Sequence, residues 1–318
     1  MSSGPSGIKS SEKFSAEGHP HEPELNPPFD VLEPSALASP LVFSSPHSGA
    51  IYPQSFLAAA RLDATTLRRS EDAYVDELFA GMVAQGAPLI RARFPRAYLD
   101  LNREPYELDP RMFDGRLPVF ANTRSVRVAG GLGTIARVVG DSQEIYGGRL
   151  KVDEALARID KLYKPYHRNL RMLLERAHRM FGTAILLDCH SMPSISSVPL
   201  PDNGLDRRIK ADVVLGDRYG TSCETAIVDV VEYELRRMGY KVLRNKPYAG
   251  GFITEHYGDP ANQFHALQIE INRVLYMDEK SMEKAARFGV VAADLRRVAD
   301  QLACFIAARG GHERAAAE

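Results

Sequence analysis

The sequence contains no tryptophan and only three cysteines among its 318 residues. The cysteines Cys189, Cys223 and Cys304 lie far apart and form no CxxC pair, which argues against a disulfide framework and a cysteine zinc knuckle. No apolar run approaches the roughly eighteen residues of a membrane span, and the N-terminus lacks the apolar core of a secretion signal. We therefore expect a cytoplasmic protein without a membrane partner.

Charge of one sign is also missing, because 40 basic residues face 41 acidic ones. Such a balance gives no strong attraction to nucleic acid and favours a small-molecule partner. The chain has no HExxH helix, no GxSxG turn and no Walker loop, so the chemistries of those motifs lose their support. The segment 131–136 matches the loose GxGxxA pattern, but no convincing strand precedes it and we interpret it as a loop.

The composition changes near residue 39. Residues 1–38 are rich in Ser, Pro, Gly, Glu and Lys, which predicts a flexible N-terminal tail, whereas residues 39–318 are expected to form a single α/β domain. In that domain, apolar runs predict strands at 41–44, 89–94, 98–101, 184–187, 213–215, 241–243 and 267–271.

Helical periodicity predicts helices between these strands. One follows Ser70, its expected N-cap, and ends at Gly86; another covers 152–180 with a kink at Pro165; two more cover 221–238 and 279–307. Alternating strands and helices predict a three-layer αβα sandwich with a mainly parallel or mixed central sheet.

Two histidines follow predicted strands directly, at His47 and His190. Ligands of open α/β sheets gather where the strands end, and a catalytic zinc ion takes three protein ligands of the His, Asp or Glu type. We expect Asp72 to be the third ligand, with Glu71 as the alternative. Both acids could instead complement a helix dipole, and the histidines could merely cap strands through hydrogen bonds.

Two more acids stand in or beside strands. Asp188 precedes His190 by two residues, so both side chains share a face and Asp188 can orient the imidazole by a hydrogen bond. Glu270 lies within an alternating strand, where a carboxylate is costly unless it has a role, and we expect it to be the general base. The alternative is a salt-bridged acid of an edge strand.

Cations are also needed for the oxyanion of amide hydrolysis and for the carboxylates of an acidic substrate. We expect Arg103 to stabilise the oxyanion, with Arg96 and Asn102 as substrate contacts. The glycine-rich loop 248–258 could close over the substrate and includes His256, which we expect to contact the substrate or to replace the third ligand.

Taken in order, these motifs resemble those of the N-formylglutamate amidohydrolase family between Pro40 and Asp278. The motifs are SPHSG at 45–49, SED at 70–72, DLNR at 100–103, DCHS at 188–191, LGD at 215–217, GGFITEHYG at 250–258 and HALQIE at 265–270. The resemblance implies a zinc-carboxypeptidase-like fold, similar to phosphorylase/hydrolase-type sandwiches, and zinc held by His47, Asp72 and His190. It also implies hydrolysis of N-formyl-L-glutamate to formate and glutamate, a step of histidine degradation.

Alternatives remain at this stage. Glu255 stands where the resemblance leads us to expect a basic residue, and an acid there would repel a dicarboxylate. A zinc amidase or carboxypeptidase acting on another N-acyl amino acid or a peptide therefore stays open, as does a non-catalytic protein that binds a dicarboxylate. Two histidines and one carboxylate also suit other divalent metals.

Overall fold

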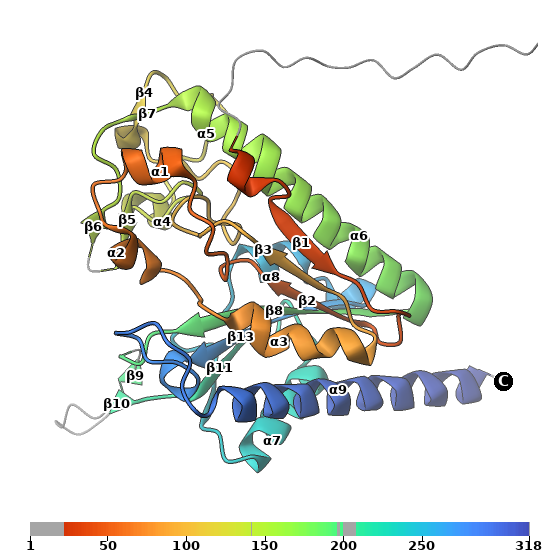
Figure 1. Ribbon diagram of the computed structural model, residues 1–318. Coiled ribbons are helices and arrows are strands. Elements are labelled where there is room, and N and C mark those ends of the chain that lie inside the picture. Colours follow the sequence, from red (N-terminus) through yellow and green to blue (C-terminus); the bar gives the residue numbers. More distant parts are fainter. Residues whose placement is uncertain (1–21, 141, 196–197, 200–207, 318) are drawn as a thin grey trace, which may run out of the picture.

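The computed structural model describes residues 22–317 except 141, 196–197 and 200–207. A seven-stranded sheet lies at its centre (Figure 1), with the strand order β1-β3-β2-β8-β13-β11-β12. The four neighbours β3, β2, β8 and β13 are parallel, and so are β11 and β12, whereas β1 and β11 run antiparallel to β3 and β13. The strands are β1 Phe29–Leu32, β2 Leu41–Ser45, β3 Leu89–Ala92, β8 Ala184–Met192, β11 Val213–Gly216, β12 Val242–Arg244 and β13 Phe264–Asn272.

The two long central strands β8 and β13 are buried along nearly their whole length. Successive side chains of a strand point to opposite faces of the sheet. On β8, Leu186 joins the hydrophobic cluster on one face while Leu187 joins the cluster on the other. This double burial explains why β8 begins with the continuous apolar run 184–187.

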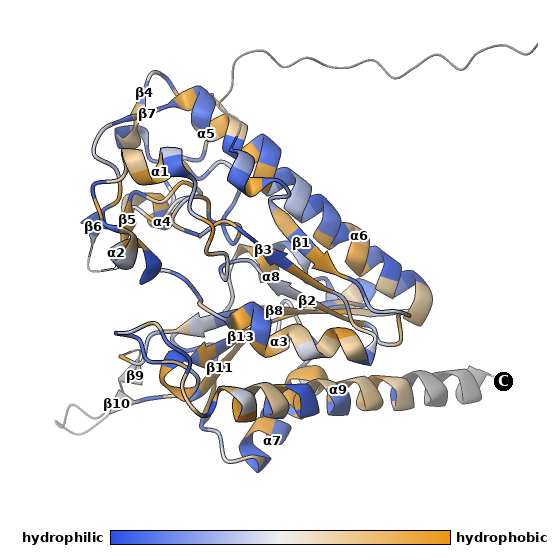
Figure 2. Ribbon diagram, in the orientation of Figure 1, coloured by the Kyte–Doolittle hydropathy of each residue, from blue (hydrophilic) through white to orange (hydrophobic). Residues whose placement is uncertain are grey.

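Helices cover both faces of the sheet (Figure 1). On one face lie α5 Val152–Arg158, α6 Lys164–Phe181 and α8 Phe252–Tyr257, and on the other lie α3 Val75–Phe79, α7 Thr225–Arg237 and α9 Phe288–Ala317. Helix α6 is blue on one side and orange on the other in Figure 2, since its apolar residues face the sheet. The three-layer αβα fold with a mixed sheet is thus confirmed.

Shorter elements gather around α5 at one end of the molecule (Figure 1). They are the helices α1 Gln54–Ala59, α2 Ala64–Arg68 and α4 Val126–Ala129 and two small sheets, β4 Phe113–Asp114 with β7 Leu150–Lys151 and β5 Val138–Val139 with β6 Gln143–Glu144. A further small sheet pairs β9 Val198–Pro199 with β10 Arg208–Ile209. Short 3-10 turns lie at 23–25, 80–85, 110–112, 260–262 and 273–275.

Several boundaries differ from those expected. Residues 29–32, which the composition assigned to a tail, form the edge strand β1 and pair with β3. Residues 1–21 of the expected tail lie outside the described residues. The predicted strand at 98–101 is a turn, because Tyr98 and Leu99 donate backbone hydrogen bonds back to Pro95 rather than to a neighbouring strand.

Two helices also begin or bend differently. Helix α3 begins after Tyr74, which has a left-handed φ of 64°, so Ser70 is not its N-cap and Asp72 precedes the helix. The long helix from Val152 is interrupted by a π-turn at Ile159–Tyr163, just before Pro165, instead of a simple proline kink. Within the described residues, no helix is both long and apolar enough to cross a membrane.

Candidate active site

His47 and His190 lie together at the carboxyl-terminal ends of two neighbouring strands. His47 lies two residues beyond the end of β2, and His190 lies near the end of β8, the parallel neighbour of β2. The loop before α3 approaches the same strand ends, because the backbone N–H of Asp72 donates to the carbonyl of His47 over 3.0 Å. Three side chains that are 25 or more residues apart in the sequence therefore meet, and each is at least 97 % buried.

The three side chains converge on one oxygen. Oδ2 of Asp72 lies 3.0 Å from Nδ1 of His190 and 3.4 Å from Nδ1 of His47. One ligand atom from each residue can be chosen so that all three atoms lie within 4.8 Å of one another, which makes the trio a group that could hold a metal ion. Two imidazoles and one carboxylate are a common ligand set for catalytic zinc.

His47 presents a lone pair to this point. Its Nε2 donates to Oδ1 of Asp100 over 2.7 Å, because a carboxylate can only accept. Its Nδ1 is buried without a hydrogen-bond partner. A buried polar atom left unpaired costs free energy, so this nitrogen fits a metal ligand whose tautomer is fixed by the bond at Nε2.

His190 lies between two carboxylates. Its Nε2 is 2.9 Å from Oδ2 of Asp188, and its Nδ1 is 3.0 Å from Asp72. Burial alone would lower the pKa of His190, but the negative charges of Asp188, Asp72 and Glu270 raise it well above its ordinary value. The structure thus places Asp188 where the two-residue spacing predicted it.

The second oxygen of Asp72 is held from the other side. Oδ1 accepts hydrogen bonds from Nη2 of Arg273 over 3.1 Å and from the hydroxyl of Ser191 over 3.3 Å. Burial opposes ionisation, yet the hydrogen bond from His190 and the nearby imidazole of His47 keep the pKa of Asp72 well below its usual range. Asp72 is therefore a fixed anion with one oxygen turned to the two histidines.

Glu71, the alternative ligand, points elsewhere. Its Oε1 accepts from the hydroxyl of Tyr52 over 2.6 Å, and its carboxylate pairs with Arg68. Burial raises its pKa, against the hydrogen bond from Tyr52. Of the two neighbouring acids, only Asp72 joins the histidines.

Glu270 stands beside the cluster on the adjacent strand. In the parallel pair of β8 and β13, Glu270 is in register with His190, and both lie on the face that carries α6 and α8. Its Oε1 accepts from the amide of Gln268 over 2.8 Å. Burial raises the pKa of Glu270 to about 7, helped by the charge of Asp72 and opposed by His190 and Arg96. A carboxyl group with that pKa can accept a proton near neutral pH.

The two predicted arginines both contact Asp100. Nη2 of Arg96 lies 2.8 Å from Oδ2 of Asp100, and Nη2 of Arg103 lies 3.4 Å from the same oxygen. Arg103 also donates to the carbonyls of Leu132 and Asn102. Although burial works to lower it, the pKa of Arg96 is raised by the negative charges of Asp100, Asp72 and Glu270.

Asn102 links the site to α8. Its amide nitrogen lies 3.3 Å from Oδ2 of Asp188, and its oxygen accepts from the backbone N–H of Ile253 over 2.8 Å. A Cβ on Gly251 would lie 2.4 Å from the Asn102 amide, so this close approach requires glycine. The glycine-rich segment is therefore packed against the site through Asn102, and its residues 252–257 form a helix.

His256 is not brought to the cluster. Its side chain is exposed on α8, where its ring stacks on Phe252 at 5.0 Å and meets Tyr257 edge-on at 4.8 Å. The group of possible metal ligands found among the described residues does not include it. Asp72 and not His256 completes the group with His47 and His190 that could hold a metal ion.

Sequence reasoning missed two contacts. Asp100 accepts from Nε2 of His47, but the sequence shows it only as part of the DLNR motif, since nothing in the sequence pairs residues 53 positions apart. Arg273, which donates to Asp72, lies three residues after Glu270 and directly follows the strand that contains it. Its place just beyond a strand end was the one available signal.

The fold and this site define an α/β hydrolytic enzyme with a buried cluster that could hold a metal ion. The chain belongs to the N-formylglutamate amidohydrolase family, whose sequence model matches residues 39–277, and it is thus an amidohydrolase.

Relatives support this assignment. The N-formylglutamate deformylase of Pseudomonas putida is 29 % identical over 246 residues, covering 76 % of this chain and 82 % of the relative. The enzyme of the same name from Pseudomonas aeruginosa is 29 % identical over 245 residues, covering 76 % and 84 %. The crystal structure of N-formylglutamate amidohydrolase from Ralstonia eutropha JMP134 has a TM-score of 0.81 and 38 % identity, covering 88 % of this chain and 98 % of that one. A protein from Agrobacterium tumefaciens with 17 % identity and a TM-score of 0.63 shares the fold.

Proposed function

We propose that the enzyme hydrolyses N-formyl-L-glutamate to formate and L-glutamate, as in histidine degradation, with a zinc ion held by His47, Asp72 and His190. The observation that carries the proposal is the buried, unpaired Nδ1 of His47 beside Asp72 and His190, with Glu270 in register on the next strand. The names of the relatives supply the substrate.

Zinc in such a site supplies Lewis-acid polarisation of a carbonyl and a lowered pKa for a water molecule. The chain supplies the proton transfers. Glu270 accepts a proton from the attacking water and donates it to the leaving nitrogen, so that one water is consumed as the C–N bond breaks. With a pKa of about 7, the carboxylate of Glu270 can accept that proton near neutral pH.

Arginine positions suit the remaining charges. The side chain of Arg96 is 26 % exposed and is held at Asp100, the carboxylate that also contacts His47, so it can reach a substrate oxyanion or carboxylate. Arg103 is 13 % exposed and held by two carbonyls. We therefore assign the substrate contact to Arg96 and give Arg103 a supporting role through Asp100.

Glu255 does not argue against an acidic substrate. Its carboxylate lies 3.2 Å from Nη2 of Arg218, so the charge that would repel a dicarboxylate is paired. A substrate with two carboxylates is thus compatible with this position, which the sequence alone put in question.

The test is metal content and formate release from N-formyl-L-glutamate, with N-acetyl-L-glutamate and a formylated dipeptide as competing substrates. We expect about one zinc per chain and the highest kcat/KM for N-formyl-L-glutamate. Preference for another acyl compound would refute the substrate, and a protein that binds glutamate without any turnover would be a binding protein.

Glu270→Gln tests the base. We expect kcat to fall by about 10²–10⁴-fold with metal content retained. Glu234→Gln is the matched control, because Glu234 is also a buried acid but pairs with Arg237 on α7, in the opposite helix layer. Equal kcat in the two variants would mean that Glu270 is not the base.

A further inference from the structure

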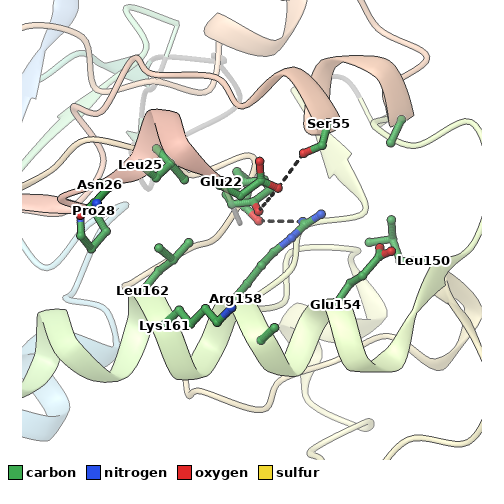
Figure 3. A pocket seen from close by; sticks show the side chains of 13 residues that line it. Glu22, Leu25, Asn26, Pro28, Ser55, Leu150, Glu154, Arg158, Lys161 and Leu162 are labelled. Atoms are coloured by element: carbon green, nitrogen blue, oxygen red, sulfur yellow. Dashed lines mark hydrogen bonds between the residues drawn. The ribbon is translucent and has the colours of Figure 1, made fainter. Parts of the chain in front are cut away.

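A cavity lies away from the predicted catalytic residues (Figure 3). It has a volume of about 360 Å³, within the range of small-molecule sites. Helix α5 and the π-turn after it form one wall, and the segment 22–28 lies opposite. The lining residues are Glu22, Leu25, Asn26, Pro28, Ser55, Ala59, Tyr98, Leu150, Glu154, Ala157, Arg158, Lys161 and Leu162.

Arg158 is the unusual member of this lining. It is 91 % buried, and its guanidinium carbon lies 3.9 Å from the centre of the Tyr98 ring. Nη1 donates to the hydroxyl of Tyr146 over 2.8 Å and to the carbonyl of Tyr98 over 3.3 Å. Among the described residues, no carboxylate lies within ion-pair distance of it. A buried arginine is normally paired with a carboxylate, since an uncompensated charge is expensive to bury.

The free side of this guanidinium faces the cavity. Nε and Nη2 have no hydrogen-bond partner in the part of the chain that the structure describes, and both keep some solvent-accessible surface. Both nitrogens are thus accessible from a cavity that Arg158 itself lines. Two adjacent N–H groups of an arginine match the two oxygens of a carboxylate.

The remaining walls of the cavity add an apolar surface and a second cation. Leu25, Leu150 and Leu162 are buried and line the cavity with the methylene and ring carbons around them. Lys161, one helical turn beyond Arg158, is exposed and has no ion-pair partner among the described residues. Lining of this kind binds a charged group attached to an apolar body.

The acids of the cavity differ in their availability. Oε1 of Glu22 already accepts from Ser55 over 2.6 Å and from Tyr98 over 3.2 Å. Glu154 lies one turn before Arg158 on α5 and lacks an ion pair among the residues described. Glu154 could therefore take the ammonium group of an amino acid, whereas a simple carboxylic acid would leave it free.

We propose that this cavity binds a small molecule that carries a carboxylate on an apolar body, with the carboxylate on Arg158 and Lys161. The site is distinct from the cluster around Asp72, because the two share no side chain. They share one loop, since Tyr98 lies between Arg96 and Asp100, and its carbonyl accepts from Arg158.

The test is calorimetric titration of the full chain with three probes of one carbon skeleton. 4-Methylpentanoate has the carboxylate alone, L-leucine has carboxylate and ammonium, and isopentylamine has the ammonium alone. We expect saturable binding of at least one of the two carboxylates and none of the amine. Tighter binding of L-leucine identifies an amino acid as the ligand class, and tighter binding of 4-methylpentanoate identifies a carboxylic acid.

Variants locate the binding. Arg158→Lys keeps the charge but loses the fork, and we expect affinity to fall by about tenfold or more. Lys161→Ala changes an exposed position, so its folding is not in question, and it should weaken binding severalfold. The matched control is Lys164→Ala, because Lys164 lies one turn further on, is paired with Asp160 and does not line the cavity.

Three results would overturn the proposal. They are the absence of saturable binding of both carboxylates to the parent protein, binding of isopentylamine alone, and equal loss of affinity in Lys161→Ala and Lys164→Ala.

Discussion

Asp100→Asn tests the proposed metal site without touching a proposed ligand. The 2.7 Å bond from Nε2 of His47 to Asp100 is buried and charge-assisted. Asparagine keeps an acceptor of the same shape but removes the charge. A hydrogen bond to a charged group contributes about 1.5–3 kcal/mol to stability and a neutral one about 1 kcal/mol. Asp100→Asn should therefore weaken the bond to His47 by on the order of 0.5–2 kcal/mol. Loss of such a partner typically weakens metal binding by about 10–100-fold, and we expect a result near the lower end.

The assay is a competition titration of zinc against a chelator of known affinity, followed by thermal unfolding of the metal-free protein. Asp109→Asn is the control, because Asp109 is equally buried and also paired with two arginines, Arg111 and Arg137, but contacts no histidine. Both variants should lose stability, and only Asp100→Asn should lose zinc affinity. If the two variants bind zinc as tightly as each other, Asp100 does not orient His47 toward a metal.

Three further predictions follow from single contacts. Gly49→Ala should destabilise the protein by about 2 kcal/mol or more, because its Cβ would lie 2.2 Å from the carbonyl oxygen of Phe94, whereas Gly148→Ala, with nothing within 4 Å, should stay within about 0.5 kcal/mol in denaturant unfolding. Burial lowers the pKa of His167 from 6.5 to about 3. The unfolded chain then binds the extra proton between these values, so the free energy of unfolding should fall as pH drops through that window, by at most about 1.4 kcal/mol per pH unit, and His167→Asn should flatten this slope. His256→Ala should leave zinc content and formate release unchanged, whereas loss of zinc in this variant would mean that His256 is a metal ligand.

The sheet could be predicted from the sequence because its central strands are buried on both faces. The run Ala184–Leu187 is recognised by its apolar composition and Leu267–Ile271 by its alternation of apolar and polar residues, and both lie in strands of the structure. The edge strand Phe29–Leu32 could not be found in the same way. It is only half-buried and follows a polar segment, so composition alone assigned it to a tail.

The site could be predicted as a set of residues but not as a geometry. His47, Asp188 and His190 follow from their places at strand ends. The sequence predicts Asp72 in the first turn of a helix, but the helix begins only at Val75. Asp72 therefore lies beside the histidines in a loop and not in the predicted helix. The bond between His47 and Asp100 depends on a turn at 98–101 that reads as a strand by its apolar residues, and only tertiary packing reveals that turn.

The charges of the site give a separate argument for a cation. The site contains four buried carboxylates, those of Asp72, Asp100, Asp188 and Glu270, and three arginines, of which Arg96 and Arg103 pair with Asp100 and Arg273 pairs with Asp72. With neutral histidines the site carries one net negative charge, which would repel the anionic substrate that we propose. The neighbouring carboxylates raise the pKa of His190, which favours a proton on its ring between Asp72 and Asp188. A divalent ion that displaced this proton would leave the site with one net positive charge, and a site of that sign attracts a dicarboxylate where the proton alone would only neutralise it.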